Sequence, residues 1–158
     1  MKNHRNAELI GIIEKQLKLL DRINESIGQA IGHDVPLLGK TGNAAVLVAG
    51  LIENYYTCLE TAFQKISQHF ENHLEPAKWH AELLMKMTLR LEDVRIPAVS
   101  EGNYGALLEL QKFRHFRRYY FEMEYDWDRL DFILKKLKSA HPLAVADLLH
   151  FVAFLKSL

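Results

Sequence analysis

The sequence is poor in cysteine and has no excess of charge of either sign. Cys58 is the single cysteine among the 158 residues, so an intramolecular disulfide and a metal site built from several thiolates are both excluded. Lysine plus arginine and aspartate plus glutamate number 20 each, which gives a formal net charge of zero. No overall field therefore draws the protein toward nucleic acid, and any anion binding has to be local.

Long hydrophobic runs are also missing. The longest, from Ala44 to Ile52, is nine residues, whereas a helix that spans a bilayer needs about 20. The N-terminal sequence MKNHRNAELI is polar and lacks the hydrophobic core of a signal peptide. With 49% hydrophobic and 25% charged residues, the composition is that of an ordinary soluble domain. The sequence thus predicts a protein that does not associate with membranes, and a cytoplasmic location is the expectation.

The alternation of polar and apolar residues that marks a half-buried strand is absent. Apolar residues recur instead every three or four positions, the spacing that places them on one face of a helix. Helices are predicted at about residues 5–30, 41–72, 77–91, 104–138 and 142–156. Together they predict an all-α, antiparallel bundle of four main helices plus a C-terminal helix, in a single domain spanning residues 1–158.

Three kinds of residue set the expected helix boundaries. Thr41 is a suitable N-terminal cap for the second helix, and Pro76 suits the first turn of the third. Pro142 is expected to open the last helix. A loop between the first two helices is expected where helix-breaking residues cluster, at Gly28, Gly32, Pro36 and Gly39.

Charge is unevenly distributed in one stretch, residues 113–130, FRHFRRYYFEMEYDWDRL. Basic residues come first and acidic residues follow, with aromatic side chains in both halves. Arg114 and Arg118 are four residues apart and are therefore neighbours on a helix, where like charges repel by roughly a few tenths of a kcal/mol. An adjacent anion offsets this repulsion, and it is either a phosphate of RNA or nucleotide or a carboxylate of the protein itself. The carboxylate candidates are Glu53, Glu60 and Glu122.

This stretch resembles the signature helix of HepT-like HEPN proteins, a family of all-helical endoribonuclease toxins. In that helix an Arg is followed, after four residues, by a His, then any residue, then a Tyr, and a stretch resembling Glu-Leu-Asp-Trp lies downstream. Arg114 matches the Arg, and residues 124–127, EYDW, match the downstream stretch with one change. The resemblance implies a HEPN-like fold whose motif-bearing part is about residues 41–138. The likeness covers roughly residues 45–137 and includes the segments 53–60, 79–84 and 95–99.

Two motif positions differ from the family pattern. Tyr119 stands where the His is expected, and Phe121 stands where the Tyr is expected. RNA cleavage without a metal needs a base for the ribose 2′-hydroxyl, an acid for the leaving oxygen and a cation for the phosphorane. The resemblance assigns catalysis to Arg114 and Tyr119, although a phenol, with a reference pKa of about 10, is a poor base at neutral pH. Neither a metal nor a cofactor is expected. The residues expected to contact phosphate are Arg114, His115, Arg117 and Arg118.

Helix geometry sets a condition on such a site. His115 lies about 100° around the helix from Arg114, and Tyr119 lies about 140° away. Neither side chain therefore forms a compact site with Arg114 on one straight helix. A bend near Tyr119, or the same helix of a second subunit, is required. The resemblance implies a symmetric homodimer in which the motif faces a shared cleft.

The resemblance implies an RNA-targeting toxin component of a toxin–antitoxin type system, with weak or lost endoribonuclease activity because the motif is altered. One alternative is a HEPN relative that does not cleave and binds RNA, a nucleotide or a protein partner. Another is an unrelated helical adaptor whose arginines form structural ion pairs. In some such systems the antitoxin is a small nucleotidyltransferase that adenylylates the motif Tyr. Phe121 has no hydroxyl, so Tyr119 and Tyr120 are the expected substitutes.

Overall fold

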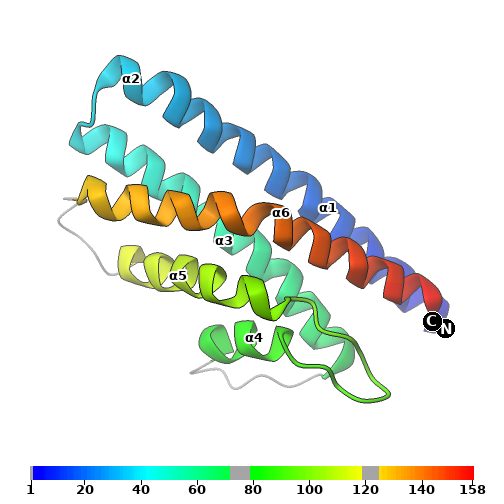
Figure 1. Ribbon diagram of the computed structural model, residues 1–158. Coiled ribbons are helices and arrows are strands. Elements are labelled where there is room, and N and C mark those ends of the chain that lie inside the picture. Colours follow the sequence, from blue (N-terminus) through cyan, green and yellow to red (C-terminus); the bar gives the residue numbers. More distant parts are fainter. Residues whose placement is uncertain (1, 72–78, 119–124) are drawn as a thin grey trace.

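The computed structural model describes residues 2–71, 79–118 and 125–158, and this part of the chain is almost entirely helical (Figure 1). The described residues contain no strand, only an isolated β-bridge between Leu91 and Arg95. The predicted all-α class is therefore confirmed. A π-helical turn, Ala30–Asp34, joins the first two helices. The helices are α1 (Lys2–Gln29), α2 (Val35–Leu38), α3 (Gly42–Phe70), α4 (Trp79–Met87), α5 (Glu101–Arg118) and α6 (Trp127–Ser157).

The long helices α1, α3, α5 and α6 lie side by side in an antiparallel bundle, as predicted (Figure 1). Helix α3 contacts α1, α4, α5 and α6, so it is the central helix of the bundle. The short helix α4 packs against α3 and α5. The beginning of α1 and the end of α6 lie at the same end of the bundle. None of the described helices is both long enough and apolar enough to cross a bilayer.

The sequence of α3 explains its central position. Its buried residues are spread over a wide arc of the helix, so that several neighbours can pack against it at once. Small side chains at Ala44, Ala45 and Ala49 are buried and allow close approach of those neighbours. The helix begins where predicted, because Thr41 Oγ1 accepts a hydrogen bond from the Ala44 amide at 3.1 Å.

The predicted loop over residues 28–39 is wrong for most of its length. The chain continues as the π-helical turn and then α2, and non-helical backbone begins only at Gly39, whose φ of 80° ends the helix. Burial of Ile27, Ala30 and Val35 in the core outweighs the cost of a helical glycine, which is about 1 kcal/mol. Pro36 lies in the first turn of α2, where a missing N–H is tolerated.

The predicted single helix over 104–138 is also wrong, because Tyr125 and Asp126 are not helical and a new helix, α6, begins at Trp127. Asp126 caps α6 by accepting a hydrogen bond from the Asp128 amide at 2.9 Å. Helix α6 then continues through Pro142, so the predicted C-terminal helix is its second half. Buried Asn103 supports α6 near the proline by donating to the Ala140 carbonyl at 3.2 Å.

The third helix also differs from its prediction. Helix α4 ends at Met87, four residues before the predicted end at about residue 91. The residues that follow turn back on themselves, and Leu91 and Arg95 form the isolated bridge. Pro76, which was expected to open this helix, lies outside the described residues.

Candidate functional site around Arg114

The motif arginine, Arg114, lies on the inner face of α5 and is 5% exposed. Its guanidinium donates from Nη1 to Glu60 Oε1 at 2.7 Å and from Nη2 to Glu60 Oε2 at 2.9 Å. Glu60 comes from α3 and is also 5% exposed. This is a bidentate, charge-assisted pair, the geometry in which a guanidinium best matches a carboxylate. Glu60, one of the carboxylates considered from the sequence, is therefore the partner of Arg114.

A third helix brings an imidazole to this pair. His80, at the start of α4, has its Nδ1 3.0 Å from Glu60 Oε1 and 3.0 Å from Arg114 Nη2. Its side chain is 36% exposed, whereas those of Glu60 and Arg114 are 6% exposed. Gln111, one turn before Arg114, donates to the His80 carbonyl at 2.5 Å and fixes the start of α4 against α5. Glu60, His80 and Arg114 together are called the Arg114 cluster below.

The ring of Tyr56 packs against the guanidinium of Arg114. Tyr56 precedes Glu60 by one turn of α3, and its ring lies 4.9 Å from the Arg114 guanidinium carbon. The ring is fully buried, and within the described part of the chain its hydroxyl has no hydrogen-bond partner. Burial raises the pKa of Tyr56 far above its usual value, Glu60 raises it further, and Arg114 partly offsets both effects. The hydroxyl is therefore protonated at neutral pH.

The electrostatics of the cluster limit what Arg114 can do. Its positive charge is neutralised by Glu60 in a buried setting, so a phosphate must compete with a carboxylate that already has ideal geometry. The carboxylate also contacts the imidazole, an arrangement that fixes the ring orientation. With Arg114 engaged by Glu60, the imidazole of His80 is the member of the cluster whose chemistry suits proton transfer.

The other predicted site residues are only partly placed. His115 is exposed on α5, on a different face from buried Arg114. Arg117 and Arg118 form the end of α5, but their side chains lie outside the described part of the structure. Tyr119, Tyr120 and Phe121, together with the alternative partner Glu122, also lie outside the described residues. Their assigned roles stay predictions.

The sequence pattern did not place His80 beside Arg114. The two residues are 34 positions apart, and no local spacing connects them. A weak signal existed, because Trp79-His80 and the segment 53–60 both belong to the family resemblance. That signal marks segments that share a fold, and only the packing of α3, α4 and α5 shows which of their polar side chains meet.

A second three-helix network lies away from the motif. His141 of α6 is 2.8 Å from the Tyr55 hydroxyl on α3 and 3.0 Å from Asp21 on α1. Tyr55 is fully buried, the His141 side chain is 13% exposed and the Asp21 side chain is 61% exposed, so this network links three helices from the core to the surface. Burial raises the pKa of Tyr55 far above its usual value, with smaller contributions from Cys58 and Asp21. Because the network links α1, α3 and α6, its role is structural.

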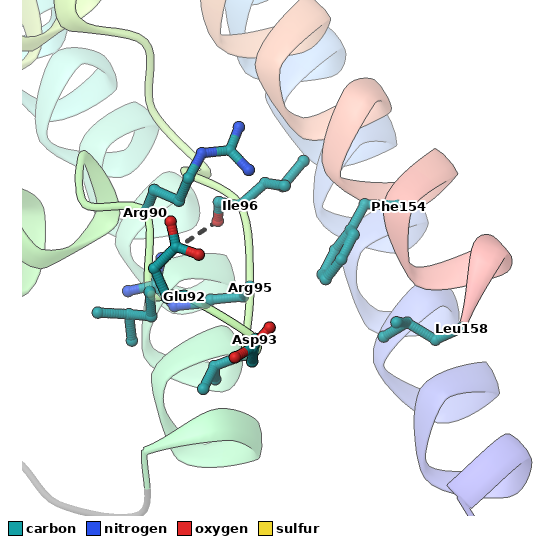
Figure 2. Close-up of a pocket in the computed structure, with 9 residues that line it drawn as sticks. Arg90, Glu92, Asp93, Arg95, Ile96, Phe154 and Leu158 are labelled. Atoms are coloured by element: carbon teal, nitrogen blue, oxygen red, sulfur yellow. Dashed lines mark hydrogen bonds between the residues drawn. The ribbon is translucent and has the colours of Figure 1, made fainter.

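A pocket of about 280 Å³ lies between the turn after α4 and the end of α6 (Figure 2). Figure 2 shows Ile96 on one side and Phe154 and Leu158 on the other. Arg95 beneath it is 2% exposed and donates to Glu71 and to the carbonyls of Lys86, Leu89 and Ile96. Because Arg95 donates hydrogen bonds to backbone carbonyls at the end of α4 and in the turn that follows, its role is structural. Among the described residues no group of three or more His, Cys, Asp or Glu side chains is arranged to hold a metal.

Comparison with known proteins agrees with the motif. A family model described as HepT-like protein matches residues 47–155, which is well over half of the chain. The match includes most of α3 and all of α4 and α5, and it therefore contains every member of the Arg114 cluster. No curated protein and no solved structure is significantly similar to the chain. On the extent of the family match and on its all-helical fold, the chain belongs to the HepT-like protein family.

Proposed function

We propose that this protein is a toxin-type HepT-like protein that acts on RNA and cleaves it slowly without a metal. The observation that supports this is the Arg114 cluster, in which the motif arginine lies within hydrogen-bond distance of an imidazole and a carboxylate. An imidazole suits proton transfer at neutral pH. A carboxylate in contact with it holds the ring in one orientation, which is the arrangement that general acid–base catalysis requires.

Two features account for slow cleavage. Tyr119 replaces the motif histidine, and a neutral phenol cannot supply the acceleration of about 10²–10⁴-fold that a well-placed histidine gives through proton transfer. Glu60 also occupies the hydrogen-bonding edge of Arg114. The cation that should steady the phosphorane is therefore already engaged, and the other residues predicted to contact phosphate, His115, Arg117 and Arg118, are left to do so.

The purified protein provides the test. It is incubated with a pool of single-stranded RNA in the presence of EDTA, and the ends of the fragments are sequenced. Fragments with 5′-hydroxyl ends should accumulate slowly, because attack by the ribose 2′-hydroxyl releases the 5′-oxygen. RNA that binds the protein and stays intact would support the alternative of a HepT-like binding module.

That alternative has an observation of its own in its favour. The ion pair between Glu60 and Arg114 is buried and complete without any ligand. Such a pair is fully explained as a link between α3 and α5, so the motif arginine does not require a substrate. In this case the protein binds RNA, a nucleotide or a protein partner without cleaving.

A nucleotidyltransferase-type antitoxin is the partner proposed for either form of the function. Phe121 cannot accept an adenylyl group, because a phenyl ring has no hydroxyl. Tyr119 and Tyr120 are the candidate acceptors in the motif stretch. A nucleotidyltransferase gene next to the gene for this chain would support a toxin–antitoxin pair over a separate binding protein.

We predict a homodimer whose two-fold axis lies near α5 and the first half of α6. Large apolar side chains are exposed in this region, with Phe116 36% and Phe132 47% exposed. Each ring is covered on one face by a cation, Arg129 at 4.9 Å from Phe116 and Lys136 at 5.3 Å from Phe132. Closed two-fold dimers are the commonest assembly of soluble proteins. Light scattering should give twice the mass of one chain at micromolar concentration.

A matched pair of variants locates the dimer interface. Phe132→Glu should shift the protein toward a monomer, because it places a charge in the predicted interface. Leu149→Glu makes the same kind of change at a side chain that is 52% exposed in the second half of α6, and it should leave the mass unchanged. A monomeric parent protein, or two variants that behave alike, would contradict this placement.

A further inference from the structure

We infer that His80 is the general base of this protein and supplies from α4 the imidazole that the motif lacks at position 119. The inference rests on the proposed function, since it names the residue that performs the RNA cleavage. Its basis is that His80 Nδ1 lies 3.0 Å from Glu60 Oε1, the same oxygen to which Arg114 Nη1 donates at 2.7 Å. An arginine and a histidine thus meet at this site, although they come from different helices.

This contact removes the geometric difficulty of the motif. On α5 alone, positions 115 and 119 point about 100° and 140° away from Arg114, so a compact pair cannot form on one straight helix. His80 approaches from a separate helix and needs no bend in α5. The hydrogen bond from Gln111 to the His80 carbonyl holds α4 at the required position. A second subunit is not required to complete the pair.

Glu60 favours the tautomer of the His80 imidazole that can act as a base. When Nδ1 carries the hydrogen, it donates to Glu60 Oε1 at 3.0 Å, and the lone pair then resides on Nε2. A carboxylate that orients a histidine is the arrangement that general-base catalysis uses in hydrolases. Arg114 holds Glu60 in place and acts as a positioning residue.

Exposure distinguishes His80 from its neighbours. Its side chain is 36% exposed, while the side chains of Glu60 and Arg114 are 6% exposed, so the imidazole is the part of the Arg114 cluster that a substrate can reach. Two other partly buried imidazoles have different surroundings. His141 contacts Tyr55 and Asp21, and His69 contacts Asn6. Neither contact involves the motif arginine.

The step assigned to His80 is a transesterification within the RNA. Its Nε2 takes the proton of a ribose 2′-hydroxyl, and the 2′-oxygen attacks the adjacent phosphorus. The new bond joins the 2′-oxygen to phosphorus, and the bond from phosphorus to the 5′-oxygen breaks. The leaving 5′-oxygen takes a proton from water, and His80 returns its own proton to solvent. The products are a 2′,3′-cyclic phosphate and a 5′-hydroxyl, with no oxidant, reductant or metal involved.

The test compares the parent protein with His80→Asn and His150→Asn under single-turnover conditions in EDTA. An asparagine amide can keep the hydrogen bond to Glu60 but cannot titrate, so the fold is retained while the base is lost. The cleavage rate of His80→Asn should fall by about 10²-fold or more. Its dependence on pH between about 5 and 8, the range in which imidazole titrates, should flatten. His150, which is exposed on α6, serves as the matched control and should leave the rate unchanged.

The possible outcomes separate this inference from the proposed function. If the parent protein cleaves RNA and His80→Asn cleaves at the same rate with the same pH profile, the inference is wrong and the proposed function stands. If the parent is inactive while the double variant Tyr119→His with Phe121→Tyr, which restores the family motif, cleaves RNA, the inference about His80 is also wrong. If neither cleaves, both proposals are wrong. If His80→Asn melts at a much lower temperature, His80→Gln, measured in the same way, decides between a lost base and a lost fold.

Discussion

Arg114→Ala is expected to lower the free energy of unfolding by about 3–5 kcal/mol, because it leaves the Glu60 carboxylate buried without its partner. Both side chains are 6% exposed, and the pair has two hydrogen bonds of 2.7 and 2.9 Å. Truncation also removes the cation that covers the Tyr56 ring. Urea denaturation of the parent and variant, followed by circular dichroism, measures the difference.

Two controls identify the cause of this loss. Lys112→Ala removes an exposed cation from the same helix and should change the free energy of unfolding by about 0.5 kcal/mol or less. The double variant Glu60→Leu with Arg114→Met removes both charges, and it should recover much of the stability, since apolar replacement of a buried pair is often neutral or better. If Arg114→Ala instead keeps its melting temperature and loses RNA binding, Arg114 is a phosphate ligand and the structural role is wrong.

The double change Tyr119→His with Phe121→Tyr is expected to raise ribonuclease activity by about 10²-fold or more, because a His at position 119 can protonate the leaving 5′-oxygen, a step left to water in the unaltered protein. It restores the family motif downstream of Arg114. Toxicity on expression in bacteria should rise together with activity. Cleavage rates in EDTA and growth after induction are the two measurements, with the parent protein as the reference for each.

Matched variants test whether the gain comes from the motif. Tyr120→His adds an imidazole one residue away from the motif position and should give no comparable gain. Arg114→Ala in the restored background should abolish the gain, measured at a temperature where the variant is folded. If the parent already degrades RNA rapidly and Tyr119→Phe removes that activity, the site uses phenol chemistry and the interpretation of Tyr119 is wrong.

Much of the fold could be predicted from the sequence because its determinants are local. Apolar residues at helical spacing predicted the long helices, and Thr41 marked the start of α3 through its side-chain cap. The motif stretch at residues 113–130 indicated the family, which the match over residues 47–155 confirms. These features depend on residues that are close together in the sequence, so a periodic pattern or a short motif is enough to reveal them.

The helix boundaries depended on tertiary packing and were harder to predict. Pro142 ends a helix by its local chemistry, yet buried Ala140 and Ala144 on either side of it belong to the same core. Around Pro142 burial decides the course of the helix, and local preference gives the wrong answer. The start of α6 has a local signal instead, because Asp126 caps it with its side chain.

The candidate site was predicted only in part for the same reason. The sequence identified Arg114 as the motif arginine and Glu60 as one possible partner, but these residues are 54 positions apart. The third member of the cluster, His80, comes from another helix. Three helices have to pack before these side chains meet, and a single sequence contains no direct signal of which polar residues will share that contact.

Cleavage of RNA by the unaltered protein tests the central claim most directly. A single-stranded RNA and the same sequence with 2′-O-methyl riboses are incubated in EDTA with an excess of protein, and the products are resolved over time. We predict slow cleavage of the RNA to fragments with 2′,3′-cyclic phosphate and 5′-hydroxyl ends, and no cleavage of the methylated strand. Both strands remaining intact with the parent protein, and with the variant that restores the motif, would contradict the account.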